Sequence, residues 1–252
     1  MMMARSNALR DGPGRWPAAS PLNACAACDA RPFSVCSAIH ECDLGRLAAV
    51  AEIVEIAPGQ TFVDEGEAAR HFFNITRGTV KIFKLLPDGR RQITGFLDAG
   101  DFLGLAVDRT YAFSAEAIDT VRLCRFERPK LIGLLDEFPA FERQLLKWAS
   151  HELLAAQNQM LLLGRKTARE RVASFLLTRN RRRCPGRVAG TLVSLPMNRT
   201  DIGDYLGLTI ETVSRTITRL KRDGLIRLHG SDAIELLDPA GLETIAEGFG
   251  AA

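Results

Sequence analysis

The sequence of 252 residues predicts an α+β protein in which a β-barrel of the jelly-roll type is followed by a long helix and a winged helix-turn-helix. Three observations predict this order. Short β-rich segments separated by turn residues fill residues 54–126, and the apolar period changes to three and four residues after Pro129. Two short capped helices joined by a glycine follow residue 198.

The barrel is predicted from regularly spaced turn residues. Segments 79–85 and 92–97 are rich in β-formers, and Pro87-Asp88-Gly89 between them has turn chemistry, since proline presets φ and glycine tolerates positive φ. The other residues expected in turns between strands are Pro58-Gly59, Gly66, Gly78 and Ala99-Gly100-Asp101. This spacing is typical of a barrel or jelly roll.

The long helix is predicted from apolar residues at helical steps, among them Leu153, Ala156, Met160 and Leu163. Pro139 should divide it into a short helix and a long one that starts near Phe141. The apolar stripe is a candidate dimer seam, and the alternative is that it packs on its own barrel. Residues 153–163 contain no charged side chain, so we expect a persistent dimer.

The segment 198–222 predicts the helix-turn-helix. Asn198 followed by Asp201 resembles a capping box, Gly207 supplies the turn, and Thr209 caps the second helix. Residues 225–228 and 233–237 should form a hairpin wing.

The exposed face of the second helix carries side chains suited to DNA. Glu211, Ser214 and Arg215 are predicted to read bases, because arginine donates two hydrogen bonds to guanine and glutamate accepts from cytosine. The alternative is a plain surface pair between Glu211 and Arg215. The predicted phosphate contacts are Arg199, Thr209, Arg219 and Lys221.

The charge distribution favours the same partner, double-stranded DNA. Residues 164–229 hold 15 Lys/Arg against 5 Asp/Glu, whereas the rest of the chain holds 18 against 25. A solvated basic surface is the alternative. No apolar run is long enough to span a membrane and the N-terminus lacks a secretory signal, so we expect a cytoplasmic protein.

The order barrel, long helix, winged helix-turn-helix resembles the CRP/FNR transcription regulators over about residues 22–240. The matching stretches are Gln92–Phe96, Ala99–Gly104, Asp201–Leu208 and Glu211–Arg215. The resemblance implies a cyclic-nucleotide-binding-like barrel, a homodimer, and a surface for RNA polymerase around residues 88–98. The pattern Glu211-x-x-Ser214-Arg215 is similar to the FNR-type reading helix, which implies palindromes like TTGAT-N4-ATCAA. Arg215 would then contact guanine, Glu211 the opposing cytosine and Ser214 the flanking thymine.

Two features of the sequence concern the ligand that the barrel senses. Gly104-Leu105 stands where cyclic-AMP binders of the family have Gly-Glu, and no Arg-Ser follows, so no cyclic nucleotide is expected. Cys25-x2-Cys28-x7-Cys36 plus the remote Cys124 resembles the FNR proteins of the FnrN/FnrL type, which implies a 4Fe-4S cluster that senses oxygen.

The same residues also allow alternatives to a cluster. Four thiolates also suit zinc, Cys42 could replace Cys36, and the cysteines could bind no metal. In that last case the protein would be a FixK-like regulator controlled by its abundance or by thiol oxidation, with Cys184 a possible redox thiol among arginines. Haem bound by His40 or His71 is a further alternative. No catalytic pattern is present, so no enzyme is expected.

The predicted boundaries follow from these elements. We expect a disordered leader (1–22), a sensory arm with the barrel (23–128), a dimerisation helix (129–164), the winged helix-turn-helix (165–240) and a tail (241–252).

Overall fold

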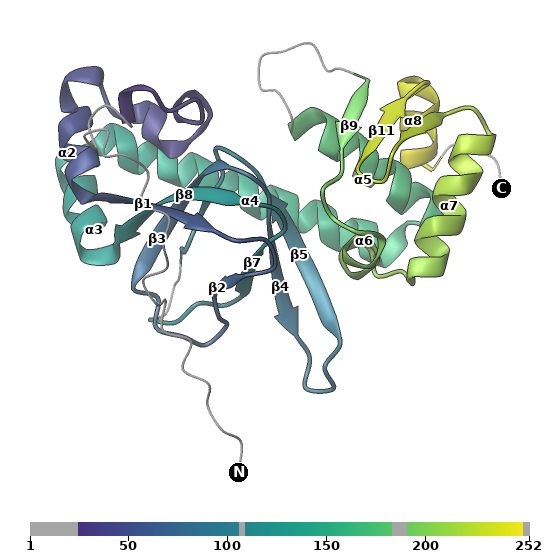
Figure 1. The fold of residues 1–252 in the computed structure, drawn as a ribbon, viewed down its shortest axis with the longest axis horizontal. Coiled ribbons are helices and arrows are strands. Elements are labelled where there is room, and N and C mark those ends of the chain that lie inside the picture. Colours follow the sequence, from purple (N-terminus) through teal and green to yellow (C-terminus); the bar gives the residue numbers. More distant parts are fainter. Residues whose placement is uncertain (1–24, 106–108, 183–190, 249–252) are drawn as a thin grey trace. The chain divides into compact units, whose positions relative to one another are not determined.

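The computed structural model describes residues 25–105, 109–182 and 191–248. The chain divides into two compact units (Figure 1). Unit 1 comprises residues 1–80 and 97–145, and unit 2 comprises residues 81–96 and 146–252. The predicted leader 1–22 and Cys184 lie outside the described residues.

The predicted jelly roll is confirmed as two four-stranded sheets, ordered β1-β8-β3-β6 and β2-β7-β4-β5. Their strands are β1 (Ala51–Ile56), β2 (Thr61–Val63), β3 (His71–Arg77), β4 (Val80–Leu85), β5 (Arg91–Leu97), β6 (Phe102–Leu103), β7 (Ser114–Ala117) and β8 (Val121–Glu127). Before them come three short 3-10 helices, η1 (Arg31–Phe33), η2 (Val35–Ala38) and η3 (Glu41–Asp43), and the α-helix α2 (Leu44–Val50).

Successive side chains of β8 point to opposite faces of the sheet, and one of these faces packs in the core. Val121 and Leu123 are buried in it, so Cys124 points to the opposite face of the sheet. Cys124 pairs with Ile53 on β1 and with Asn74 on β3, and residues directly opposite in an antiparallel ladder share a face. Cys124 and Asn74 therefore lie side by side on the outer face of the sheet.

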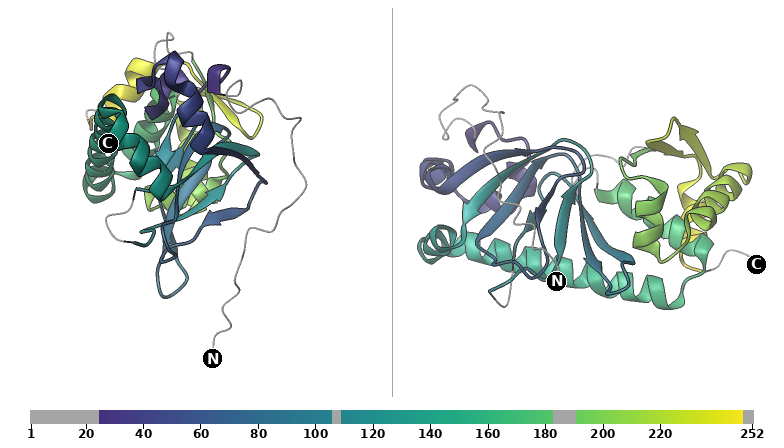
Figure 2. Two further views of the ribbon diagram at one scale, coloured as in Figure 1. Left: turned by 90° about the vertical axis from the view of Figure 1, so that its left-hand side faces the viewer. Right: turned by 60° about the horizontal axis from the view of Figure 1, so that its bottom comes forward.

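The helices confirm the predicted break at Pro139. Helix α3 (Arg128–Glu137) ends before it, and α4 (Pro139–Arg165) begins with it, since proline is favoured in a first turn where its missing N–H is not needed. Helix α4 then continues without interruption for 27 residues (Figure 2). Several large apolar side chains on it are exposed in the single chain: Leu146, Leu153, Leu154, Met160 and Leu161.

Unit 2 contains the predicted winged helix-turn-helix. Its elements are α5 (Ala168–Arg182), β9 (Leu192–Ser194), α6 (Arg199–Leu206), α7 (Ile210–Arg222), β10 (Ile226–His229), β11 (Ala233–Leu236) and α8 (Pro239–Ala246). Strands β10 and β11 form the wing, and β9 adds a third strand that the sequence did not predict.

Two predicted boundaries differ from the structure. The tail was expected from residue 241, but α8 extends to Ala246 because Leu242 and Ile245 are buried. The barrel was expected to form one unit through residue 128, but the hairpin of β4 and β5, residues 81–96, groups with unit 2. The hairpin contacts α6 through residue pairs that are 110 and 113 positions apart in the chain, and local sequence pattern carries no signal of such contacts.

Candidate functional site

Two capped helices build the reading motif as predicted. Asn198 caps α6, because its Oδ1 accepts from the Asp201 N–H at 2.8 Å. Thr209 caps α7, because its Oγ1 accepts from the Thr212 N–H at 3.3 Å. The reciprocal half of the expected capping box is absent, since the Asp201 carboxylate instead contacts basic residues of the β4–β5 hairpin.

The turn between the helices depends on two glycines. Gly207 has φ of +62°, the left-handed conformation that ends a helix and that glycine adopts without strain. Gly203 lets the helices approach closely, because a Cβ added there would lie 2.6 Å from the Leu208 carbonyl oxygen. The Leu208 N–H also donates to the Gly203 carbonyl at 3.0 Å. Gly203 was not singled out in the sequence.

Arg171 of α5 fixes two helix ends, a role that the local sequence does not indicate. Its guanidinium donates to the Leu163 carbonyl at the end of α4 and to the Leu206 carbonyl at the end of α6, both at 2.8 Å. These are carbonyls that a helix terminus leaves without partners. Arg171 therefore links the end of α4 to the turn between α6 and α7 within unit 2.

The two faces of α7 differ in burial. Val213, Ile217 and Leu220 are buried, while the predicted base readers Glu211, Ser214 and Arg215 are all exposed on the other side. Hydrogen bonds from its own backbone N–H and from Thr209, with the Arg215 charge, lower the pKa of Glu211, so its carboxylate is ionised at neutral pH.

The predicted phosphate contacts have different environments. Arg219 and Lys221 are exposed on the last turns of α7. Arg199 is half-buried and burial lowers its pKa, while Thr209 is engaged as the helix cap.

The four predicted cysteine ligands line one cavity of unit 1. Cys25, Cys28 and Cys36 come from the N-terminal arm, and Cys124 comes from the outer face of β8. The cavity has a volume of about 1040 Å³ and lies between the arm and the sheet. Cys42 is exposed, does not line the cavity, and donates its S–H to Asp43.

The cavity favours the neutral thiols of Cys25, Cys36 and Cys124. The pKa of Cys36 is raised to about 12, mainly by burial and to a smaller extent by Cys25 and Cys28, while a hydrogen bond with Ser34 acts in the opposite direction. Burial also raises the pKa of Cys124 and of Cys25, and the neighbouring cysteines add to both shifts. Four thiolates would therefore repel each other, and cations bound among them would relieve that repulsion.

Within the described parts of the chain, no group of three or more His, Cys, Asp or Glu side chains is arranged to hold a single metal ion. The cavity does contain an unpaired polar atom. The Asn74 Oδ1 is buried beside Cys124 and has no hydrogen-bond partner among the described residues. The Asn74 Oδ1 is a hydrogen-bond acceptor, so only a donor can satisfy it from the cavity.

Two family models match the chain. The cyclic nucleotide-binding domain matches residues 53–138, and the Crp-like helix-turn-helix domain matches residues 170–245. The nitrogen fixation regulation protein FixK of Bradyrhizobium diazoefficiens is 43% identical over 88% of this chain and 93% of its own length. The chain belongs to the CRP/FNR family of transcription regulators. It is a DNA-binding regulator and not an enzyme.

Further CRP/FNR relatives support this assignment. The transcriptional activator protein FnrL of Cereibacter sphaeroides is 34% identical over 87% of this chain and 93% of its own. The solved structure of FixK2 from Bradyrhizobium japonicum has a TM-score of 0.73 and 39% identity, and the match covers 81% of this chain and 99% of that one. In the described residues, no helix combines the length and apolar character needed to cross a membrane.

Proposed function

We propose that this CRP/FNR regulator reads TTGAT-N4-ATCAA-like palindromes as a dimer, and that an oxygen-labile 4Fe-4S cluster in the cysteine cavity controls its binding. The observation that carries the reading proposal is the exposed face of α7 with Glu211, Ser214 and Arg215. The observation that carries the sensing proposal is the set of four cysteines around one cavity.

Arg215→Ala tests the reading assignment. We expect it to weaken binding to the palindrome by about 1–3 kcal/mol, since a bidentate contact to guanine has that value. Fluorescence anisotropy with the palindrome and a scrambled duplex measures the loss. Arg219→Ala is the matched control, because a phosphate contact should weaken both duplexes equally and reduce the salt slope by about 1. Unchanged palindrome binding by Arg215→Ala contradicts the assignment.

The donor chemistry of the cavity fits an iron–sulfur cluster. Thiolates are the ligands such clusters use, and Cys25, Cys28, Cys36 and Cys124 would hold it. Zinc binds four thiolates as well, each at about 2.3 Å, so a zinc determination on the same protein separates the two groups.

The residues around the cavity give a route from the cysteines to the dimer helix. A bound cluster would supply an oxygen-labile link between the arm and β8. The arm leads into α2, whose Arg46 forms an ion pair with Glu137 at the end of α3. The Arg46 guanidinium also lies over the Phe138 ring at 5.5 Å, directly before α4. A change in the arm would therefore reach the start of α4 through Arg46.

The FixK-like alternative is a regulator without a cluster, controlled by its abundance or by thiol oxidation. The observation that favours it is the similarity to several FixK proteins, including 42% identity to that of Azorhizobium caulinodans. The iron and sulfide content of protein kept from air distinguishes the two. About four of each per chain supports the cluster, and background levels support the alternative.

The dimer is proposed from α4. Leu146, Ala149, Leu153, Ala156 and Met160 follow the alternating steps of three and four residues of a coiled-coil seam. All but Ala149 are exposed in the single chain.

We predict that the cluster-free protein remains dimeric. Residues 153–163 of the seam place no charged side chain against a partner, so charge repulsion does not oppose association. Sedimentation velocity of cluster-free protein measures this. A single monomer boundary at micromolar concentration contradicts the prediction.

We propose RNA polymerase as a partner at the tip of the β4–β5 hairpin, where Asp88 and Arg90 are exposed. We also propose that no cyclic nucleotide binds. The Arg128 guanidinium donates to the Gly104 and Ala69 carbonyls, each at 2.6 Å, and so is already engaged beside Gly104. Because DNA is its target, we propose a cytoplasmic location.

A further inference from the structure

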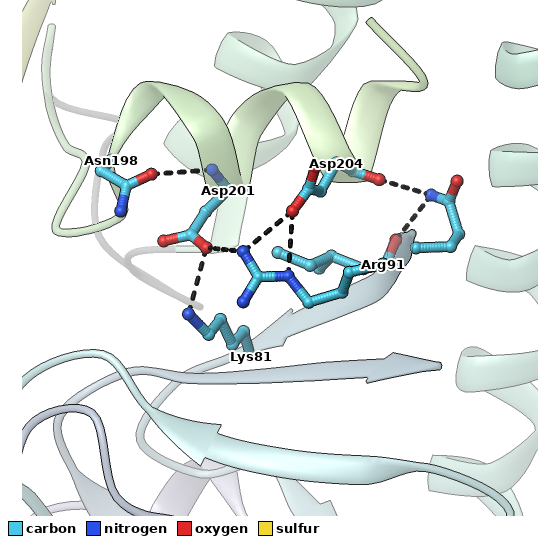
Figure 3. Close-up of polar contacts among 7 residues, drawn as sticks. Lys81, Arg91, Asn198, Asp201 and Asp204 are labelled. Carbon is cyan, nitrogen blue, oxygen red and sulfur yellow. Dashed lines mark hydrogen bonds and ion pairs between the residues drawn. The ribbon is translucent and has the colours of Figure 1, made fainter. Parts of the chain in front are cut away.

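The β4–β5 hairpin makes a polar contact with the first helix of the reading motif, inside unit 2 (Figure 3). Lys81 Nζ lies 3.1 Å from Asp201 Oδ1, and the two side chains are only 8% and 4% exposed. Arg91 reaches the same Asp201 oxygen at 2.7 Å and Asp204 Oδ2 at 2.8 Å. Two basic residues of the hairpin thus hold two carboxylates of α6.

The hairpin holds α6 at both ends. Asp201 stands in the first turn of α6, whereas the Gln92 amide donates to the Asp204 carbonyl at 2.6 Å in the last turn. The last carbonyls of a helix have no partner within the helix, so Gln92 satisfies a group that otherwise needs water. Phe96 of β5 adds an aromatic contact, with its ring centroid 5.2 Å from that of Tyr205. Contacts at both ends restrict rotation of α6 as well as its distance from the hairpin.

This orientation is transmitted to the reading helix. Gly203 of α6 packs against the Leu208 backbone just before α7, and their backbones are hydrogen bonded. A helix pair joined so closely moves as one body, so the hairpin contacts on α6 help to set the orientation of α7, together with the contact of Arg171 at the end of α6.

The chemistry of the contact favours a positioning role over a purely stabilising one. A buried ion pair is no more stabilising than apolar residues of the same volume, because desolvation offsets the attraction. It does impose one geometry, since a carboxylate left without its partner is costly to bury. Arg91 adds to this, because its planar guanidinium contacts both carboxylates only in a narrow range of orientations.

We propose that Lys81, Arg91 and Gln92 of the β4–β5 hairpin are positioning residues for DNA reading, which hold α6 and thereby set α7 for its palindrome. None of these residues lies on α7. Their effect is on sequence-specific binding, which requires that several side chains of α7 meet base edges together. Non-specific binding needs only charge, so it is insensitive to this geometry.

The test uses the full-length protein and a charge exchange. Arg91→Glu, Asp204→Arg and the double variant are titrated with the TTGAT-N4-ATCAA duplex and with a scrambled duplex, and thermal unfolding is followed by circular dichroism. Arg90→Glu is the matched control, because Arg90 makes the same charge change one residue away while pairing with Asp88 inside the hairpin. Lys81→Met tests the buried pair separately.

We expect Arg91→Glu to reduce the ratio of palindrome to scrambled affinity about ten-fold relative to Arg90→Glu, within the range of coupling between contacting residues. Adding Asp204→Arg should restore most of that ratio, and Lys81→Met should lower it as well. Equal ratios for Arg91→Glu and Arg90→Glu would overturn the proposal, as would a double variant that is not restored. A gain in palindrome affinity would also overturn it, since the hairpin would then restrain reading. If wild-type protein binds both duplexes equally, the proposed palindrome itself is wrong.

Discussion

Gly203→Ala is expected to destabilise unit 2 by about 1–3 kcal/mol and to abolish binding to the palindrome. In an ordinary helix this change is stabilising by roughly 0.5–1 kcal/mol, because alanine loses less conformational entropy than glycine. Here the new Cβ would meet the Leu208 carbonyl oxygen at 2.6 Å, and a backbone oxygen cannot rotate away. The helices α6 and α7 must therefore separate, which displaces the reading face.

Gly133→Ala is the matched control, since Gly133 also lies in a helix but a Cβ there has no neighbour within 4 Å. We expect this variant to be as stable as wild type or slightly more stable, with unchanged DNA binding. Thermal unfolding and anisotropy titrations measure both quantities. Wild-type stability and binding in Gly203→Ala would show that the two helices do not pack as described.

Cys124→Ser is expected to lower the iron and sulfide of protein kept from air to background and to remove air-sensitive DNA binding. Serine has nearly the size of cysteine, but its hydroxyl is a hard ligand that replaces a soft thiolate poorly. Cys124 is also the one proposed ligand on the sheet. Without it, no ligand from β8 would face the three cysteines of the arm. Iron analysis and the visible absorption spectrum report the loss.

Cys42→Ser provides the control for this prediction, because Cys42 is exposed and does not line the cavity. It should keep wild-type iron. The ligand assignment fails if Cys124→Ser retains full iron content, or if Cys42→Ser loses it.

Most of the fold could be predicted because the decisive signals are local. Asn198, Gly207 and Thr209 define helix ends through their own hydrogen bonds and dihedral angles, and the structure has them in these roles. Pro139 likewise marks the start of α4. The exposed face of α7 followed from the positions of Val213, Ile217 and Leu220 at helical spacing.

The contacts between distant segments could not be predicted from the sequence. Lys81 and Asp201 are 120 residues apart, and nothing near either residue indicates its partner. Asp201 instead resembled half of a capping box, which a local pattern suggests for any acid three residues after a cap. Asn74 and Cys124 share a face only through strand register, which depends on the folding of the whole sheet. For the same reason, the sequence did not predict the hydrogen bonds of Arg171 to helix ends or the close packing at Gly203.

The proposed function requires that the cysteine cavity controls how tightly α7 binds its palindrome. The most direct measurement of this control is the dissociation constant for the TTGAT-N4-ATCAA duplex, by anisotropy, of protein purified without air and then of the same sample after exposure to air. We predict tight binding before exposure and binding at least about ten-fold weaker afterwards, which corresponds to about 1.4 kcal/mol. The same dissociation constant before and after exposure would contradict the claim.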